Sequence, residues 1–135
     1  MQIKNFEYPF IVDKEEQGVL RVFEAENIPF NVKRVFTVVN AKGGSVRGKH
    51  SHIKCNQLLC CVSGEVQLKC DDGKEVIKRN LSPDTSAVFI PSGTWTELIY
   101  IENNSVLIAF CDMPYEENDY IRDYDEFLKW RKTKL

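Results

Sequence analysis

The sequence predicts an all-β fold, an antiparallel sandwich or barrel, followed by one short helix. Short apolar or alternating segments recur along residues 19–111, and turn residues separate them at intervals of roughly 8–12 residues. No stretch before residue 115 shows sustained helical periodicity. Together these observations favour a closed or two-layered antiparallel β-structure.

Eight or nine segments fit short strands, and each has a local reason. Lys33–Val39 is rich in β-branched residues, and Glu65–Cys70 alternates strictly between apolar and polar residues. Asp71-Asp72-Gly73 is a strong hairpin signal. Pro91-Ser92-Gly93 ends another strand. In chain order the predicted strands are Val19–Glu24, Lys33–Val39, Val46–His52, Gln57–Val62, Glu65–Cys70, Glu75–Arg79, Ala87–Ile90, Thr96–Ile101 and Ser105–Cys111.

The C-terminal segment Asp123–Lys132 is predicted to form the helix. Asp123 is a suitable N-cap, and Glu126 follows it at the spacing of a capping box. Tyr124, Phe127 and Leu128 then share one face, which we expect to pack on the barrel.

Length and composition indicate one soluble globular domain spanning residues 1–135. The formal net charge of -2 gives no excess basic charge for a nucleic-acid partner. The longest apolar run, Val106–Cys111, is too short to span a membrane, and the start lacks the apolar region of a signal peptide. Five cysteines without a CxxC pair indicate reduced, buried thiols, so we expect a cytoplasmic protein.

The protein has two histidines, His50 and His52, two positions apart in a segment that can be extended. Side chains alternate along a strand, so both imidazoles are expected on one face. An isolated pair of this kind is more often a surface or hydrogen-bonded pair than a functional one, and the residues around it decide the interpretation.

The spacing around the pair resembles the first motif of the cupin family, carried by Gly44, His50, His52, Gln57 and Gly64. The resemblance implies a cupin-type antiparallel β-barrel, or jelly roll. In cupins the position of Gln57 is usually Glu, and that residue and both histidines bind a metal.

The second cupin motif is present without its histidine. Pro91 and Gly93 match, but Thr96 stands where the third histidine is expected, and Thr85 stands where a glycine is expected. Two imidazoles and a neutral amide are a poor ligand set for a transition metal. We therefore predict no metal and no cofactor, and the imidazoles are free for proton transfer.

Several segments resemble a narrower family, the dTDP-4-keto-6-deoxyglucose 3,4-ketoisomerases (WxcM-like cupins). They are Ile28-Pro29-Phe30, Lys33-Arg34-Val35-Phe36, Arg47-Gly48-Lys49-His50-Ser51-His52, Asn56-Gln57, Leu59-Cys60, and Tyr115–Ile121 with Tyr124, Glu126 and Phe127. The resemblance implies a metal-free isomerase that moves the ketone of a dTDP-linked 4-keto-6-deoxy sugar from C4 to C3, ahead of transamination for surface glycans. It also implies a homodimer, often with exchanged N-terminal strands.

Proton transfer along the sugar requires a base, an acid and a group that stabilises an enediolate. We expect His50 to take the C3 proton and His52 to act as donor or relay. Arg47 is the candidate for the oxyanion, although strict alternation places it on the face opposite His50. Its participation requires a bend, which Gly48 permits.

For substrate binding we expect Arg34 or Lys33 to reach the pyrophosphate, with Arg21 as a further candidate. Gln57 could hydrogen-bond the sugar or a histidine. Trp95 is a candidate pocket wall, although a buried tryptophan in a barrel is more often part of the core.

One position departs from the family pattern. Members commonly carry an aromatic residue, often Tyr, where this chain has Thr37 after Phe36. If that tyrosine forms a catalytic hydrogen bond, another group must replace it here. The alternatives are a 3,5-epimerase of the same sugar nucleotides, a non-catalytic ligand-binding cupin and a metal-dependent cupin.

Overall fold

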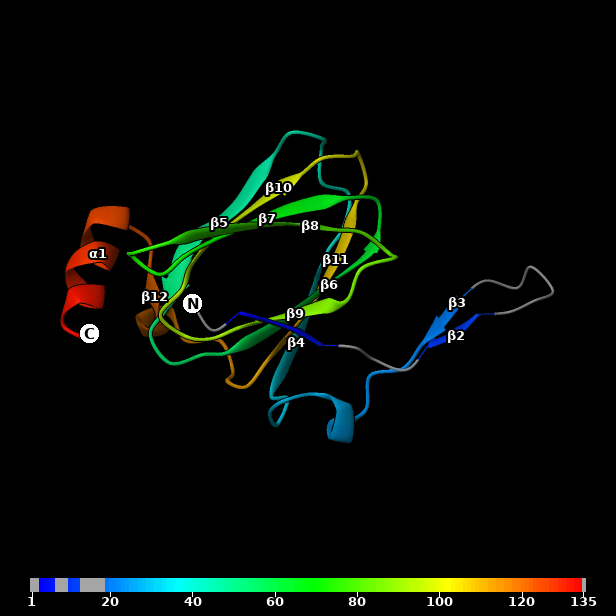
Figure 1. The fold of residues 1–135 in the computed structure, drawn as a ribbon, viewed down its shortest axis with the longest axis horizontal. Helices are drawn as coiled ribbons and strands as arrows, with labels where there is room; N and C mark the ends of the chain where they lie inside the picture. Colours follow the sequence, from blue (N-terminus) through cyan, green and yellow to red (C-terminus); the bar gives the residue numbers. More distant parts are fainter. Residues whose placement is uncertain (1–2, 7–9, 13–18, 135) are drawn as a thin grey trace.

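The computed structural model describes residues 3–6, 10–12 and 19–134, and it has the predicted antiparallel architecture. Two five-stranded sheets face each other and enclose the interior (Figure 1). The first sheet has the order β1 (Lys4–Phe6), β9 (Ala87–Ile90), β6 (Gln57–Ser63), β11 (Val106–Cys111) and β4 (Arg34–Val38). The second has the order β12 (Tyr120–Ile121), β5 (Val46–His52), β10 (Trp95–Tyr100), β7 (Val66–Asp71) and β8 (Val76–Leu81).

The apolar core lies between the two sheets. Their inward side chains form one cluster, whose fully buried members include Leu59, Leu68, Val66 and Leu107. The alternation that predicted β7 is visible in its burial, because every second residue from Val66 is buried. This cluster fills part of the barrel and leaves the remainder to the cavity described below.

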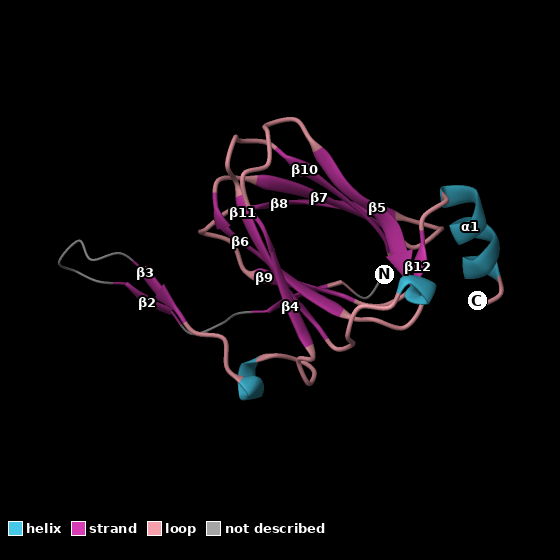
Figure 2. Ribbon diagram, turned by 180° about the vertical axis from the view of Figure 1, so that it is seen from behind, coloured by secondary structure: helices cyan, strands magenta, loops and turns pink. Residues whose placement is uncertain are grey.

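The C-terminal helix covers the outer face of the second sheet at one end. α1 (Tyr124–Lys132) begins after Asp123, whose carboxylate accepts a hydrogen bond from the Glu126 N–H at 2.9 Å. Phe127 is fully buried and packs with Trp95 and Ile121. The predicted helix and its packing face are confirmed, and Figure 2 shows the helix beside β5 and β12.

A short hairpin of β2 (Phe10–Val12) and β3 (Val19–Arg21) extends away from the barrel on the side opposite the helix (Figures 1 and 2). The predicted strand Val19–Glu24 is wrong at its end, because strand pairing stops at Arg21. A 3-10 turn at Ala25–Asn27 then leads toward β4.

The short strands β1, β2 and β12 were not predicted. Segments of two or three residues are too short to show a period of two, so their pairing depends on tertiary contacts. β12 matters most for function, because it follows the 3-10 turn Glu117–Asp119 and pairs with β5 beside His52.

No helix among the described residues is long and apolar enough to cross a membrane.

Candidate active site

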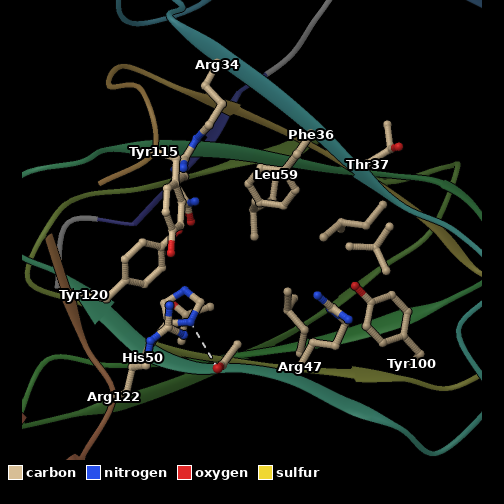
Figure 3. A pocket seen from close by; sticks show the side chains of 16 residues that line it. Arg34, Phe36, Thr37, Arg47, His50, Leu59, Tyr100, Tyr115, Tyr120 and Arg122 are labelled. Atoms are coloured by element: carbon tan, nitrogen blue, oxygen red, sulfur yellow. Dashed lines mark hydrogen bonds between the residues drawn. The ribbon is translucent and has the colours of Figure 1, made fainter. Parts of the chain in front are cut away.

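A cavity of about 490 Å³ lies inside the barrel, lined by residues of β4, β5, β6, β10 and β11 and of the segment 115–122 (Figure 3). Its size is typical of a small-molecule site. Three arginines, Arg34, Arg47 and Arg122, line it, and no carboxylate is among the described residues of its lining. The charge therefore favours an anionic ligand.

A bulge in β5 decides which side chains enter the cavity. His50 pairs with Thr96 of β10, but Gly48 pairs with Glu97, so Lys49 is left without a partner on that strand. Gly48 has a φ of 84°, and a Cβ there would lie 2.8 Å from the Thr96 carbonyl oxygen. The bulge thus requires glycine and provides the bend that brings Arg47 to the same cavity as His50.

His50 is held as a neutral base. Its Nδ1–H donates to the Gly48 carbonyl at 3.0 Å, which leaves Nε2 with a free lone pair. Burial lowers the pKa of His50 to about 4, with further lowering from His52, Arg122 and Arg34. At neutral pH this imidazole can accept a proton from a ligand in the cavity.

His52 lies beside His50, with the two ring centroids 5.0 Å apart, but it is buried and does not line the cavity. Its Nδ1–H donates to Asp119 Oδ2 at 2.9 Å. Asp119 also accepts the backbone N–H of Lys54 at 2.7 Å and that of Cys55 at 3.3 Å. Burial lowers the pKa of His52 despite the hydrogen bond and charge of Asp119, so this imidazole is also neutral. Its Nε2 is buried and has no partner among the described residues.

The residues that could hold a metal are His52, Cys55 and Asp119, whose ligand atoms lie within 4.8 Å of one another. These three residues differ from the ligand set of the cupin motif, because His50 and Thr96, which occupy two of its positions, line the cavity instead. The Asp119 carboxylate is already used by an imidazole and two backbone N–H groups. This arrangement is that of a hydrogen-bonded carboxylate that orients a histidine.

Aromatic residues and a cation from the segment 115–122 form the wall beside His50. The Tyr120 ring lies 5.0 Å from that of His50 and 4.4 Å from that of His52. The Arg122 guanidinium lies 4.3 Å from the Tyr120 centroid and forms two hydrogen bonds with Glu117, at 2.9 and 3.0 Å. Glu117 also accepts the Tyr115 hydroxyl. These contacts fix one wall of the cavity and offer ring faces for a ligand.

A buried cysteine anchors Arg34, whose guanidinium lies 5.8 Å from the Tyr115 ring centroid. Cys111 Sγ accepts hydrogen bonds from Arg34 Nη2 and from Gln57 Nε2, both at 3.5 Å. The neighbouring Cys55, Gln57 and Arg34 side chains lower the pKa of Cys111 against the effect of burial, and the pKa of Cys55 is raised. Cys111 therefore holds two lining residues, Arg34 and Gln57, in place.

The predicted substrate-binding residues are divided by the structure. Arg34 and Gln57 line the cavity, whereas Lys33, Arg21 and Trp95 do not. Lys33 is exposed before β4 begins, and Arg21 belongs to the projecting hairpin. The indole of Trp95 faces the helix, 5.6 Å from the Phe127 ring, because alternation along β10 sends Thr96 inward and Trp95 outward. Trp95 is buried and packs with Phe127 and Ile121 rather than lining the cavity.

Sequence reasoning assigned no role to several groups that build the site, among them Arg122 and Cys111. Asp119, Tyr115 and Tyr120 belong to the C-terminal segment that carried the family resemblance, so a signal was present. Tyr100 lies an even number of positions after Thr96, and the alternation of β10 places both in the cavity wall.

Comparison with known proteins identifies the family. Residues 1–132 match the family model described as FdtA: WxcM-like, C-terminal. The chain belongs to this family. A curated relative, TDP-4-oxo-6-deoxy-alpha-D-glucose-3,4-oxoisomerase of Aneurinibacillus thermoaerophilus, is 31% identical over 130 residues, 96% of this chain and 93% of the relative.

Solved structures of the WxcM-like type have the same fold. The sugar 3,4-ketoisomerase QdtA of Thermoanaerobacterium thermosaccharolyticum, solved with TDP, superposes with a TM-score of 0.91 at 29% identity, covering 98% of this chain and 96% of QdtA. A 3,4-ketoisomerase of Helicobacter canadensis gives 0.90 at 29% identity, covering 98% of each chain. A histidine-to-asparagine mutant of QdtA, 28% identical with a TM-score of 0.91 and the same coverage, has been solved with TDP-4-keto-6-deoxyglucose.

The predicted cupin-type barrel with a short C-terminal helix is confirmed. An epimerase of Mycobacterium tuberculosis shares the fold alone, with a TM-score of 0.74 at 17% identity over 87% of this chain and 66% of the epimerase.

Proposed function

We propose that this WxcM-like protein is a sugar-nucleotide 3,4-ketoisomerase that acts on dTDP-4-keto-6-deoxyglucose without a metal. The observation that carries the proposal is a neutral imidazole, His50, with a free Nε2 in a cavity lined by three arginines. The curated relative is named for a substrate of this class, and QdtA was solved with TDP and, as a mutant, with TDP-4-keto-6-deoxyglucose. A 3,5-epimerase is disfavoured, since the epimerase match is more distant and shows the fold alone.

The reaction follows from the free imidazole nitrogen of His50, which lines the cavity. The carbonyl at C4 acidifies the C3–H bond, and His50 Nε2 takes that proton to give an enediolate with charge on O4. The proton of the O3 hydroxyl moves to O4. The imidazolium of His50 then returns its proton to C4, and O3 becomes the new ketone. Every atom is retained, and the base is regenerated.

This mechanism revises the predicted role of His52. Its Nδ1–H is committed to Asp119 and its Nε2 carries no proton in the neutral ring, so it cannot donate to the substrate at rest. The ring packs against His50 and Tyr120. We assign it the role of a positioning residue that orients His50.

Arg47 is the candidate for the enediolate oxygen, because the bulge at Gly48 brings its side chain into the cavity (Figure 3). Arg34 and Arg122 are the candidates for the diphosphate, since each carries a planar guanidinium at the cavity wall.

We also propose a homodimer in a reducing compartment, the cytoplasm. The β2–β3 hairpin pairs only with itself among the described strands, and Leu20 on it is exposed. A two-stranded hairpin is marginally stable alone, so a second copy is the occupant we expect against it. Arg21 would then lie at the interface between subunits.

All five cysteines are free and buried, which supports a reducing compartment. Light scattering should give a mass twice 15.6 kDa, and a monomer would overturn the dimer.

The test is NMR of dTDP-4-keto-6-deoxyglucose incubated with the protein in D₂O. We expect conversion to a 3-keto product, whose configuration at C4 the same spectrum gives, and any deuterium at C4 measures how often the His50 imidazolium exchanges its proton with solvent before returning it. His50→Asn should lower turnover by about 10³-fold while dTDP binding persists. Binding without formation of the 3-keto product would favour the non-catalytic alternative, and full turnover by the variant would remove His50 from the mechanism.

A further inference from the structure

Tyr100 carries a buried hydroxyl that the fold leaves without a partner. It is the last residue of β10, its side chain is fully buried, and it forms part of the cavity wall. Its hydroxyl has no hydrogen-bond partner among the described residues. Figure 3 shows the hydroxyl directed toward the cavity, beside the Arg47 side chain.

Other tyrosine hydroxyls of this protein have partners. Tyr124 donates to Asp71 Oδ2 at 2.5 Å, and Tyr115 donates to Glu117. A buried hydroxyl without a partner destabilises a fold, and phenylalanine would fill the same space without that cost. The hydroxyl of Tyr100 is therefore explained by a group that is present only when the cavity is occupied.

The surroundings of Tyr100 define the chemistry of that group. Burial raises the pKa of Tyr100, although the charge of Arg47 opposes the shift, so the phenol keeps its proton and can donate. Arg47 is exposed and also offers only donors. Two adjacent donors of this kind fit one acceptor oxygen, and more strongly one that gains negative charge. Leu98 and Leu107 also line the cavity, and their apolar side chains do not compete with the ligand oxygen for the two donors.

We propose that Tyr100 donates a hydrogen bond to an oxygen substituent of the bound hexose, the same oxygen that Arg47 binds. The proposal rests on the proposed function for the identity of the sugar. Tyr100 would contact the sugar from β10, whereas the base His50 contacts it from β5.

The experiment compares Tyr100→Phe with Tyr124→Phe, two variants that each remove one hydroxyl. We expect Tyr100→Phe to lower kcat/KM by about tenfold or more without lowering the melting temperature. Tyr124→Phe removes a hydroxyl that has a protein partner, so it should lower the melting temperature and leave kcat/KM unchanged. The opposite patterns separate a ligand contact from a structural one.

Affinity measurements keep this test independent of turnover. Dissociation constants for dTDP and for the dTDP-sugar are measured by calorimetry on wild type and Tyr100→Phe. We expect the variant to bind dTDP as wild type does and to lose part of the additional affinity that the sugar confers. An unchanged kcat/KM with unchanged sugar affinity would overturn the role of Tyr100, as would a melting temperature lowered as in Tyr124→Phe. A wild-type protein that binds the sugar but never turns it over would instead overturn the proposed function.

Discussion

Strands β5 and β10 have two faces, and the contrast between them separates stability from chemistry. On the outer face, Trp95 packs against Phe127 of the helix and donates its indole N–H to Glu97 at 3.0 Å. On the inner face, His50 offers a free Nε2 and Tyr100 a hydroxyl without a partner. The same two strands thus carry a satisfied apolar contact outside and incomplete polar groups inside.

The outer face therefore contributes to the stability of the fold, and the inner face offers polar groups to a ligand. Polar groups that the protein leaves incomplete are costly in a fold, and they are tolerated where a ligand completes them. The bulge at Gly48 belongs to the inner face in this sense, since it interrupts regular pairing to bring Arg47 inward. Changes on the outer face should therefore affect folding, and changes on the inner face should affect catalysis.

The largest effect is expected from the outer face. Phe127→Ala removes a fully buried ring that contacts Trp95, Tyr124 and Trp130, so the free energy of unfolding should fall by about 3–5 kcal/mol. The measurement is urea denaturation followed by tryptophan fluorescence. The kcat/KM of the protein that remains folded should stay within about threefold of wild type.

The matched control is Lys129→Ala on the exposed side of the same helix, with an expected change below about 0.5 kcal/mol. If Phe127→Ala abolished turnover in a folded protein, the two faces would be coupled and the contrast would be wrong.

An intermediate effect is expected where the two faces meet, at Asp119. In Asp119→Asn the amide cannot accept from both backbone N–H groups and from His52 Nδ1–H, so His52 loses its orientation. We expect kcat/KM to fall about 10- to 100-fold, less than for His50→Asn, because His52 acts through His50. Steady-state kinetics measures this effect.

Asp112→Asn is the control for loop anchoring. Asp112 accepts the backbone N–H of Asn56 at 2.8 Å and contacts no histidine in the described structure. Its replacement should lower stability and leave the catalytic rate near wild type. Equal kinetic losses in the two variants would show that Asp119 only holds the loop.

The parts of the molecule that repeat a local pattern were predictable from the sequence. The alternation of β7, the hairpin signal after it and the N-cap at Asp123 are local properties, and the structure has them. The pair His50 and His52 was also predictable as sharing one side of a strand, because a period of two fixes that relation.

The remaining features depend on contacts between distant segments. The pairing of Tyr120 with His52 joins residues 68 positions apart, and no local pattern encodes it. The same holds for the hydrogen bond from Arg34 to Cys111. The pairing of Asp119 with His52 and of Cys111 with Arg34 could therefore be identified only from the three-dimensional structure.

The smallest effect is expected from pH, because burial places the titration of His50 below the usual working range. A histidine with an unshifted pKa of 6.5 would lose half of its base form at that pH, whereas the pKa of His50 is about 4. We expect kcat/KM to change by less than about twofold between pH 8 and 5.5 on account of His50 and to fall tenfold per unit well below pH 4. The groups that face His50 are His52 on its own strand, Tyr120 of β12, and the guanidinium groups of Arg122 and Arg34.

Protonation of His50 should lower the free energy of unfolding at a higher pH than the pH at which it lowers kcat/KM. The unfolded chain binds a proton at His50 near pH 6.5 and the folded chain only near 4, so His50 costs no stability above about 6.5 and destabilises the fold progressively as pH falls toward 4. The pKa of Cys111 is also lowered, by Cys55, Gln57 and Arg34, and Cys111 holds Arg34, so Cys111→Ser serves as the control. A rate that halves near pH 6.5 in both wild type and Cys111→Ser would contradict a buried, neutral His50. A decline near pH 6 that Cys111→Ser abolishes would assign that loss to Cys111.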